Sequence, residues 1–388
     1  MKKITASLLL PALLMVAACS KTENPEIVEE TPDVVQFVFT SDAHYGLTRP
    51  AFRGATNVDS HTVNAALVSQ INNMSGYTFP ADGGVNSGQK IDHIDYVLQA
   101  GDIANRMEES AGVQLASESW AQFETDYIKN LTVKDFQGKK ATLYMVPGNH
   151  DVSNTIGYYA KMSPASDATS MANIYNLMLK PTTQLTAETF NYDNNRINYS
   201  KEIGGLHFSF IQMWPDSAVR IWLEKDLANV PQSTPVVILG HDQPAVVSNH
   251  FTNPNGDHDI NLTDKFDNVL DEMFKDGKVA TIKAEKEQRA FANFLKKHSN
   301  VKLYLHGHVH KSDFYTWQGP DNDLNLPVVG ADSPMKGLVS VPDEKLLSFA
   351  VIALDTKTKK ITIRECYWNS NPANPNEITW GKTETIQL

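Results

Sequence analysis

Five short apolar runs in this chain end in clusters of Asp, Asn or His residues, and this recurring arrangement restricts the folds open to it. The runs cover residues 34–44, 94–102, 141–151, 235–244 and 301–310. They are rich in β-branched and aromatic residues and are bounded by Gly or Pro, which predicts buried strands. Segments with apolar residues at helical spacing accompany them, at 62–74, 116–131, 218–230 and 284–298. Strands that alternate with helices predict an α/β fold.

Two further segments near the C-terminus predict that part of the sheet is antiparallel. Residues 346–355 and 359–368 alternate like the two strands of a hairpin. Residues 74–90 and 244–264 are rich in Gly, Asn, Asp and Pro and are expected to form long loops. Since no internal repeat or second linker interrupts residues 34–388, we expect a single large domain there.

The polar clusters share one position, the C-terminal end of a predicted strand, where open α/β sheets place their functional sites. Each cluster alone is explained by a turn or a solvated surface residue. Five such coincidences are harder to explain, and a mixture of Asp, Asn and His ligands suits Zn, Fe or Mn better than Ca. The clusters are Asp42 and His44; Asp102 with Asn105; Asn149, His150 and Asp151; His241; and His308 with His310.

In order, these clusters read D-x-H, G-D-x-x-N, G-N-H-D, an isolated His after a strand, and G-H-x-H. This series resembles the motifs of the calcineurin-like metallophosphoesterase family, from Asp42 to His310. The resemblance implies mixed β-sheets packed as a central sandwich flanked by helices, with a dinuclear metal site at the strand C-terminal ends. The residues in and around these motifs are most similar to those of the family branch that contains cyclic-nucleotide and glycerophosphodiester phosphodiesterases.

The resemblance also implies roles for individual residues. Two divalent or trivalent ions (Mn, Fe or Zn) would be held by seven ligands, with Asp102 bridging and a metal-bridging hydroxide attacking phosphorus. His150 would face the substrate and assist, oriented by Asp151. The implied ligands are Asp42, His44, Asp102 and His310 for one ion, and Asp102, Asn149, His241 and His308 for the other.

Some residues depart from the family pattern or lie outside it. Asp242 stands where many relatives of that branch have a second His, which puts a substrate contact there in doubt. Residues 45–90 are expected to be a substrate-shaping insertion, and Arg53, His61 and Arg106 are candidate phosphate contacts or surface residues. His306 lies outside the motif and is expected to be structural or to support a ligand residue.

The N-terminus predicts export. Lys2 and Lys3 precede a short apolar stretch that ends at Cys19 in "VAACS", which resembles a bacterial lipobox. We therefore expect residues 1–18 to be a lipoprotein signal peptide, Cys19 to be acylated, and residues 19–33 to be an acidic, disordered tether. The protein would then be an exported bacterial lipoprotein, on the periplasmic side, outer membrane or cell surface, and membrane-attached through its lipid anchor only.

The net charge and the number of cysteines exclude some classes of function. The formal net charge of −11 argues against a nucleic-acid binding surface, whereas bound metal ions still permit a small phosphorylated substrate. The only cysteine besides Cys19 is Cys366, so neither a disulfide framework nor a cysteine zinc site is expected. The expected activity is hydrolysis of phosphodiesters or phosphomonoesters. The alternatives are a lipid-anchored metal- or phosphate-ligand-binding protein without turnover, and a metallohydrolase acting on amides or carboxyl esters.

Overall fold

The computed structural model describes Met1 and residues 32–105, 114–152, 167–192, 194–246 and 285–388. The chain divides into residues 1–31 and residues 32–388, and the fold lies in the second unit. Cys19, the predicted signal peptide after Met1 and nearly all of the predicted tether fall outside the described residues. In the described ranges, every helix is too short or too polar to cross a membrane.

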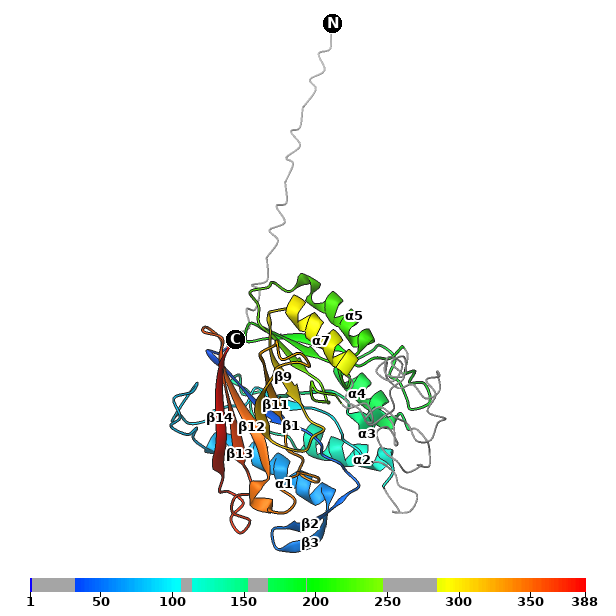
Figure 1. The fold of residues 1–388 in the computed structure, drawn as a ribbon. Helices are drawn as coiled ribbons and strands as arrows, with labels where there is room; N and C mark the ends of the chain where they lie inside the picture. Colours follow the sequence, from blue (N-terminus) through cyan, green and yellow to red (C-terminus); the bar gives the residue numbers. More distant parts are fainter. Residues whose placement is uncertain (2–31, 106–113, 153–166, 193, 247–284) are drawn as a thin grey trace. The chain divides into compact units, whose positions relative to one another are not determined.

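Two six-stranded sheets form the centre of the fold (Figure 1). The first has the order β14-β13-β12-β1-β4-β5, with β1 (Val34–Thr40), β4 (Tyr96–Gln99), β5 (Thr142–Met145), β12 (Ser348–Asp355), β13 (Lys360–Tyr367) and β14 (Thr379–Gln387). The second has the order β10-β11-β9-β8-β7-β6, with β6 (Tyr199–Ile203), β7 (Leu206–Phe210), β8 (Val236–Leu239), β9 (Val301–His306), β10 (Asp313–Trp317) and β11 (Leu326–Gly330). A separate hairpin pairs β2 (Thr48–Phe52) with β3 (Ala55–Asp59).

The two sheets pack face to face through alternate side chains of their strands. Phe37 of β1 lies 5.5 Å from Phe208 of β7, measured between ring centroids, and Tyr144 of β5 lies 5.2 Å from Phe210. Phe37 and Phe208 belong to one buried apolar cluster that draws on both sheets. Burial of each such ring contributes about 1.5–3 kcal/mol to the free energy of unfolding. The predicted sandwich of mixed sheets is therefore confirmed.

Helices cover the outer faces of the sheets. Within the described residues, the α-helices are α1 (Ser60–Asn72), α2 (Ala116–Phe123), α3 (Asn149–Val152), α4 (Thr169–Leu179), α5 (Ser217–Asp226) and α7 (Glu285–Lys297). Short turns of other helix types are η1 (Met74–Gly76), the π-helix η2 (Glu124–Lys129), η3 (Leu227–Asn229) and η5 (Glu344–Leu346). The four predicted helices correspond to α1, α2 with η2, α5 with η3, and α7.

Each sheet has its own helical cover. Leu67 of α1 shares a buried cluster with Val38 of β1, on the face of the first sheet opposite to the sandwich core. Phe291 of α7 stacks on Trp317 of the second sheet, with ring centroids 5.5 Å apart. Helices α5 and α7 lie side by side (Figure 1), and the Arg220 guanidinium of α5 donates to Glu287 of α7 at 3.0 Å.

Strand direction brings the predicted motifs to one edge of the sandwich. β1, β4 and β5 run parallel, as do β7, β8, β9 and β11. The segments that follow β1, β4, β5, β8 and β9 carry the five polar clusters. The predicted antiparallel hairpin is also present, because β12 pairs with β13 from Ser348 to Leu354. Cys366 is fully buried in β13.

Candidate metal centre

The chain turns abruptly after β1, β4 and β9, and five of the seven predicted ligands lie in these turns. Five non-glycine residues adopt positive φ angles there, a conformation that few such residues take. The values are 56° at Asp42, 45° at His44, 55° at Asp102, 64° at His308 and 57° at His310. Backbone hydrogen bonds join the first two turns, from Asp42 N to Gly101 O at 2.9 Å and from His44 N to Asp102 O at 3.0 Å. The ligand residues therefore stand on a rigid, hydrogen-bonded backbone.

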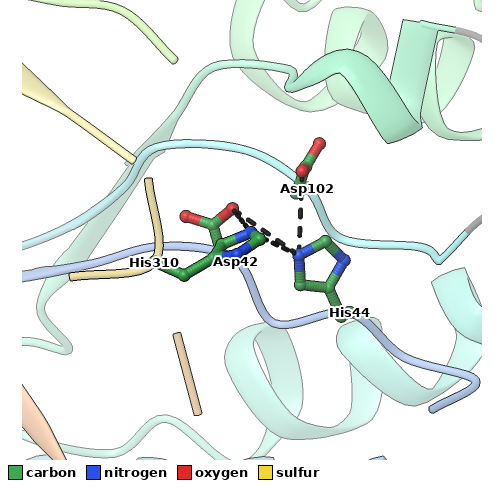
Figure 2. A group of neighbouring side chains, drawn as sticks. All are labelled: Asp42, His44, Asp102 and His310. Carbon is green, nitrogen blue, oxygen red and sulfur yellow. Dashed lines mark hydrogen bonds and ion pairs between the residues drawn. The ribbon is translucent and has the colours of Figure 1, made fainter. Parts of the chain in front are cut away.

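A first group of four side chains gathers around one point. The Nε2 atom of His44 lies 3.6 Å from Asp42 Oδ1 and 3.7 Å from Asp102 Oδ2 (Figure 2). The Nε2 atom of His310 lies 3.2 Å from Asp42 Oδ1 and 3.2 Å from His44 Nε2. One atom of each residue lies within 4.8 Å of one atom of every other, as the ligands of a single metal ion do.

A second group shares Asp102 with the first. His241 Nε2 lies 3.4 Å from Asp102 Oδ2, and Asp102, His241 and His308 again meet within 4.8 Å. The side-chain oxygen of Asn149 lies 3.1 Å from His241 Nε2 and 3.0 Å from His308 Nδ1. The second group thus combines a carboxylate, an amide oxygen and two imidazoles. Two adjacent groups with a common carboxylate have the arrangement of a dinuclear metal site.

The ligand atoms of these groups are better suited to bind a metal ion than to bind one another. Asp42 Oδ1 and Asp102 Oδ2 are buried and make no hydrogen bond among the described residues. A buried carboxylate oxygen without a partner is costly, unless a cation provides the missing interaction. Since both atoms point at imidazole nitrogens, a bound cation would stabilise all of them together.

The carboxylates are held in the ionised form that a metal requires. Burial raises the pKa of Asp42, but the positive charge of His310 outweighs it and holds the pKa of that carboxyl well below its usual value. Burial likewise opposes ionisation of Asp102, and the neighbouring His241 lowers the pKa of that carboxyl overall.

The imidazoles respond to their surroundings in opposite directions. Burial lowers the pKa of His44 to about 3, with the positive charge of Lys336 acting in the same direction. Burial also lowers the pKa of His241, but the negative charges of Asp102 and Asp42 raise it to about 10. Without a metal, His241 therefore carries a proton that a cation would replace.

Contacts outside the ligand cluster orient two of the imidazoles. His241 Nδ1 donates to the Ala100 carbonyl at 2.6 Å, which leaves Nε2 facing Asp102 and Asn149. His308 faces the ligand cluster with Nδ1 instead of Nε2. Its Nδ1 faces Asn149, while its Nε2 lies 3.5 Å from Asp242 Oδ1. Contacts of this kind with carbonyls and carboxylates fix ring orientation and raise ligand basicity in metalloproteins. Asp242, flagged by the sequence only as a departure, is completely buried behind His308.

Glycine is required at two positions where the turns meet. A Cβ atom on Gly148 would lie 2.6 Å from His241 Cε1 and 2.5 Å from the Asp102 amide nitrogen. A Cβ atom on Gly307 would lie 2.5 Å from Asp42 Oδ2. Both contacts are closer than real Cβ atoms approach, so the glycines allow the turns to bring their ligands together.

His150 lies beside the two groups. Its Nε2 is 3.8 Å from Asp102 Oδ2, and its ring meets the His44 ring edge-on with centroids 4.7 Å apart. Its backbone N–H donates to Asp102 Oδ1 at 2.8 Å. His150 is therefore close enough to act on a ligand of the cluster while remaining separate from the two groups.

Asp151 makes different contacts from those the sequence led us to expect. Its carboxylate accepts hydrogen bonds from the backbone N–H groups of Gly148 at 2.9 Å and of Ile103 at 3.1 Å. No hydrogen bond joins the side chains of Asp151 and His150 in the described part of the chain. Burial and the negative charge of Asp102 raise the pKa of Asp151 to about 7. Asp151 thus holds together the turns that carry Asp102 and His150, and it orients His150 only through the backbone.

Other residues singled out by sequence are engaged elsewhere. Arg53 donates to Asn369 at 2.8 Å and packs on Phe52, and His61 lies 3.2 Å from Asp126, so both have partners away from the ligand groups. Arg106 lies outside the described residues. His306 is structural, as expected, because Nδ1 donates to the Gly307 carbonyl at 2.7 Å and Nε2 lies 3.1 Å from the Tyr315 hydroxyl.

Of the two segments predicted to be long loops, the structure describes all of the first and little of the second. Residues 74–90 pack against β13, where Asp82 pairs with Arg364 at 2.7 Å and the Val85 N–H donates to Thr362 at 2.9 Å. These polar contacts lead away from the ligand groups. Most of the loop at 244–264 lies outside the described residues.

Sequence reasoning missed the segment after β11, where Ser333 donates to the Asp42 carbonyl at 2.8 Å. This segment carries no motif that marks it.

No curated protein matches the chain in sequence. Similar solved structures include a dimetal phosphatase from Danio rerio, with a TM-score of 0.48, 10% identity, and coverage of 85% of this chain and 95% of that chain. Vps29 from Entamoeba histolytica with Zn²⁺ has a TM-score of 0.33 and 11% identity, covering 91% and 98%. A phosphopantetheinyl hydrolase from Mycobacterium tuberculosis has a TM-score of 0.33 and 11% identity, covering 77% and 90%.

The sequence profile of the calcineurin-like phosphoesterases matches residues 35–312, which is most of the chain and includes every strand-end cluster. The order of the motifs, the two packed sheets and the paired ligand groups all accord with that match. This protein belongs to the calcineurin-like phosphoesterase family.

Proposed function

We propose that this protein is a hydrolase that uses two metal ions to cleave phosphoester bonds of a small phosphorylated substrate. Membership of the calcineurin-like phosphoesterases supports metal-dependent phosphoester hydrolysis in general. The observation that carries the specific proposal is the position of Asp102, which belongs to two ligand groups at once. A carboxylate shared in this way is what a pair of neighbouring cations requires.

The ligands divide between the two ions. We assign Asp42, His44, Asp102 and His310 to the first ion, and Asp102, Asn149, His241 and His308 to the second. When bound, two such ions supply a nucleophile at neutral pH and positive charge for the phosphoryl oxygens. The mixture of carboxylate, amide and imidazole ligands is compatible with Mn, Fe or Zn.

The chain's own residues supply orientation and a further polar group. His150, next to Asp102 and His44, is assigned to stabilise charge that develops on the phosphoryl oxygens or to protonate the leaving group. Asp151 is assigned to keep the Gly148 and Ile103 turns in register, so that Asp102 and His150 hold their relative positions.

The decisive experiment combines metal analysis with turnover. Purified protein is analysed for its metal content and assayed on p-nitrophenyl phosphate and bis-p-nitrophenyl phosphate with added Mn or Zn, then on nucleotides, cyclic nucleotides and sugar phosphates. We expect about two ions per chain and metal-dependent release of nitrophenol. Bound metal without turnover of any substrate would support the alternative, a metal- or phosphate-ligand-binding protein.

We also propose that the protein is an exported bacterial lipoprotein, held at a membrane surface by acylated Cys19 and residues 19–33. The basic, apolar and small-residue pattern before Cys19 supports this localisation. Cys19→Ala should move the protein from the membrane fraction to the soluble fraction. Unchanged membrane association of that variant would overturn acylation as the anchor.

A further inference from the structure

One segment contacts the backbone of two assigned ligands of the first ion, Asp42 and His310. It follows β11 and covers residues 331–340, and we call it the β11 loop. The Ser333 hydroxyl donates to the carbonyl of Asp42 at 2.8 Å. The backbone N–H of Leu338 donates to the carbonyl of His310 at 2.8 Å. The β11 loop therefore supports two turns that lie far apart in the sequence.

Both of these ligands have a backbone conformation that few side chains adopt. Their φ angles are 56° at Asp42 and 57° at His310, in the left-handed region. Such a conformation persists only where the surrounding contacts hold it. At Asp42, the N–H donates to the Gly101 carbonyl at 2.9 Å and the carbonyl accepts from Ser333. Contacts on both sides of Asp42 thus fix the direction of its carboxylate.

The Ser333 side chain is itself held by the β11 loop. It is completely buried, and its hydroxyl oxygen accepts from the backbone N–H groups of Lys336, at 2.9 Å, and of Met335, at 3.2 Å. Because a hydroxyl has one proton and two lone pairs, these two contacts leave the proton for the Asp42 carbonyl. The carbonyl of Ser333 accepts from the Gly337 N–H at 3.1 Å. The donor that reaches Asp42 is therefore fixed in direction.

A buried arginine restrains the β11 loop from the β2–β3 hairpin. Arg49 of β2 is fully buried, and its guanidinium donates to the carbonyls of Pro334, at 2.7 Å, and of Ser340. Its Nε donates to the carbonyl of Ala51 at 3.0 Å. Burial of a guanidinium is costly unless its donors are satisfied, which favours the arrangement that keeps these contacts. Arg49 thus holds the loop on both sides of the turn that Ser333 begins.

The ligands of the second ion have supports from other segments. His241 Nδ1 donates to the Ala100 carbonyl at 2.6 Å, and His308 Nε2 lies 3.5 Å from Asp242 Oδ1. These contacts come from the segments after β4 and β8 and do not involve the β11 loop. A change at Ser333 should therefore act mainly on the first ion.

We propose that Ser333 is a positioning residue for the first ion, and that it directs the carboxylate of Asp42 through the Asp42 backbone. This inference rests on the two-ion site of the proposed function. Without the hydroxyl, the Asp42 carbonyl loses this donor and the left-handed turn is free to relax. Asp42 Oδ1 then faces His44 and His310 less well. Loss of a contact that orients a ligand typically weakens metal binding about 10- to 100-fold.

The test is calorimetric titration of the metal-free full chain with Mn or Zn. Ser333→Ala should weaken the affinity for the first ion about 10-fold or more, and the affinity for the second much less. Ser333→Thr keeps the hydroxyl and should bind the first ion nearly as wild type does. Ser209→Ala is the matched control, because Ser209 is also fully buried and loses a hydrogen bond of 2.9 Å to Asp226, in β7 and away from the ligands. This control should bind both ions as wild type does.

A double variant identifies which of the two affinities changes. Asp42→Asn should retain the second ion alone, so its remaining affinity belongs to that ion. Adding Ser333→Ala to Asp42→Asn should leave this affinity nearly unchanged, because the ligand that Ser333 positions is already lost. Melting temperatures of the metal-free proteins measure stability separately. Destabilisation by both Ser333→Ala and Ser209→Ala, with weaker first-ion binding in the former alone, distinguishes positioning from general stability.

Several results would overturn the inference while leaving the proposed function intact. They are wild-type affinity of Ser333→Ala for the first ion, equal weakening of both ions, and a loss in Ser333→Thr as large as in Ser333→Ala. Wild type that binds two ions but hydrolyses no substrate would overturn the proposed function alone. Wild type that binds fewer than two ions would overturn both.

Discussion

Asp242 lies 3.5 Å from Nε2 of His308, whereas Nδ1 of the same ring lies 3.0 Å from the side-chain oxygen of Asn149. The imidazole thus connects a buried carboxylate on one side to the ligand cluster on the other. Such a carboxylate orients the ring and makes the coordinating nitrogen a stronger base. Asp242 therefore has a role towards the second ion even though it is not one of its assigned ligands.

Asp242→Asn should weaken metal binding about 10- to 100-fold, because an amide orients His308 less well and adds no negative charge. Calorimetric titration of metal-free protein with Mn or Zn measures this. Asp33→Asn is the matched control, since Asp33 forms an exposed ion pair with Lys357. Equal affinities of the two variants would show that Asp242 does not influence the ion.

Substitutions at Asp102 and Asp42 should differ in how many ions they remove. Asp102 belongs to both ligand groups and Asp42 to one. Asp102→Asn should therefore lose both ions and at least about 100-fold in turnover, since the ions supply several kcal/mol of catalysis. Asp42→Asn should retain the second ion. Elemental analysis of both proteins provides the count, and two ions in Asp102→Asn would contradict a bridging carboxylate.

His150→Ala should keep both ions yet lose about 100- to 1,000-fold in kcat, as expected for loss of a group that stabilises developing charge. Metal content and kcat are measured on the same preparation. His61→Ala is the control, because His61 is partly exposed and pairs with Asp126. Full activity of His150→Ala would remove that residue from the mechanism.

Gly148→Ala should disturb the site, because the added methyl group would meet His241 and the backbone of Asp102. We expect a loss of about 1–3 kcal/mol in unfolding free energy and weaker metal binding. Gly76→Ala has open space around the new methyl group and a backbone that accepts it, so it should leave both properties unchanged. Chemical denaturation with and without added metal measures the two effects. Wild-type stability of Gly148→Ala would show that the turns tolerate a side chain.

His207 should make stability depend on pH at a place remote from the metal ligands. Burial lowers its pKa, but Asp226, 2.9 Å away, and Glu202 raise it overall. Because the folded protein binds this proton more tightly, the added stability is fully present below the unfolded pKa of about 6.5. It is lost as pH rises through the folded pKa. His207→Gln should remove this component.

Urea unfolding at about pH 6 and about pH 9 tests the sign. The difference in unfolding free energy between wild type and His207→Gln should be larger at the lower pH. A difference that grew with pH would mean that the folded protein disfavours the charged imidazole.

Much of the architecture was predictable from sequence, for local reasons. An apolar run of four to seven residues that ends at Gly or Pro forms a strand wherever it is buried, so β1, β4, β5, β8 and β9 were all identified. Helices α1, α2, α5 and α7 followed from the spacing of their apolar residues, whereas α3 and α4 were not predicted. The edge strands β6, β10 and β14 were not identified, because they are only partly buried and lack a continuous apolar run. The hairpin β2 and β3 and the interior strands β7 and β11 were also not identified. Polar residues or proline interrupt the apolar residues of β7 and β11, although both strands are largely buried.

By itself, the sequence determined which residue types stand at the strand ends and in what order, because each motif is a few neighbouring residues. Only the tertiary structure decided how residues distant in the chain meet. Asp42 accepts a hydrogen bond from His308, 266 residues away, and Arg49 donates to the carbonyl of Pro334, 285 residues away. It also decided which nitrogen of His308 faces Asn149 and which faces Asp242. The physical reason is that a side chain's direction depends on backbone angles and packing across both sheets, which no short stretch of sequence specifies.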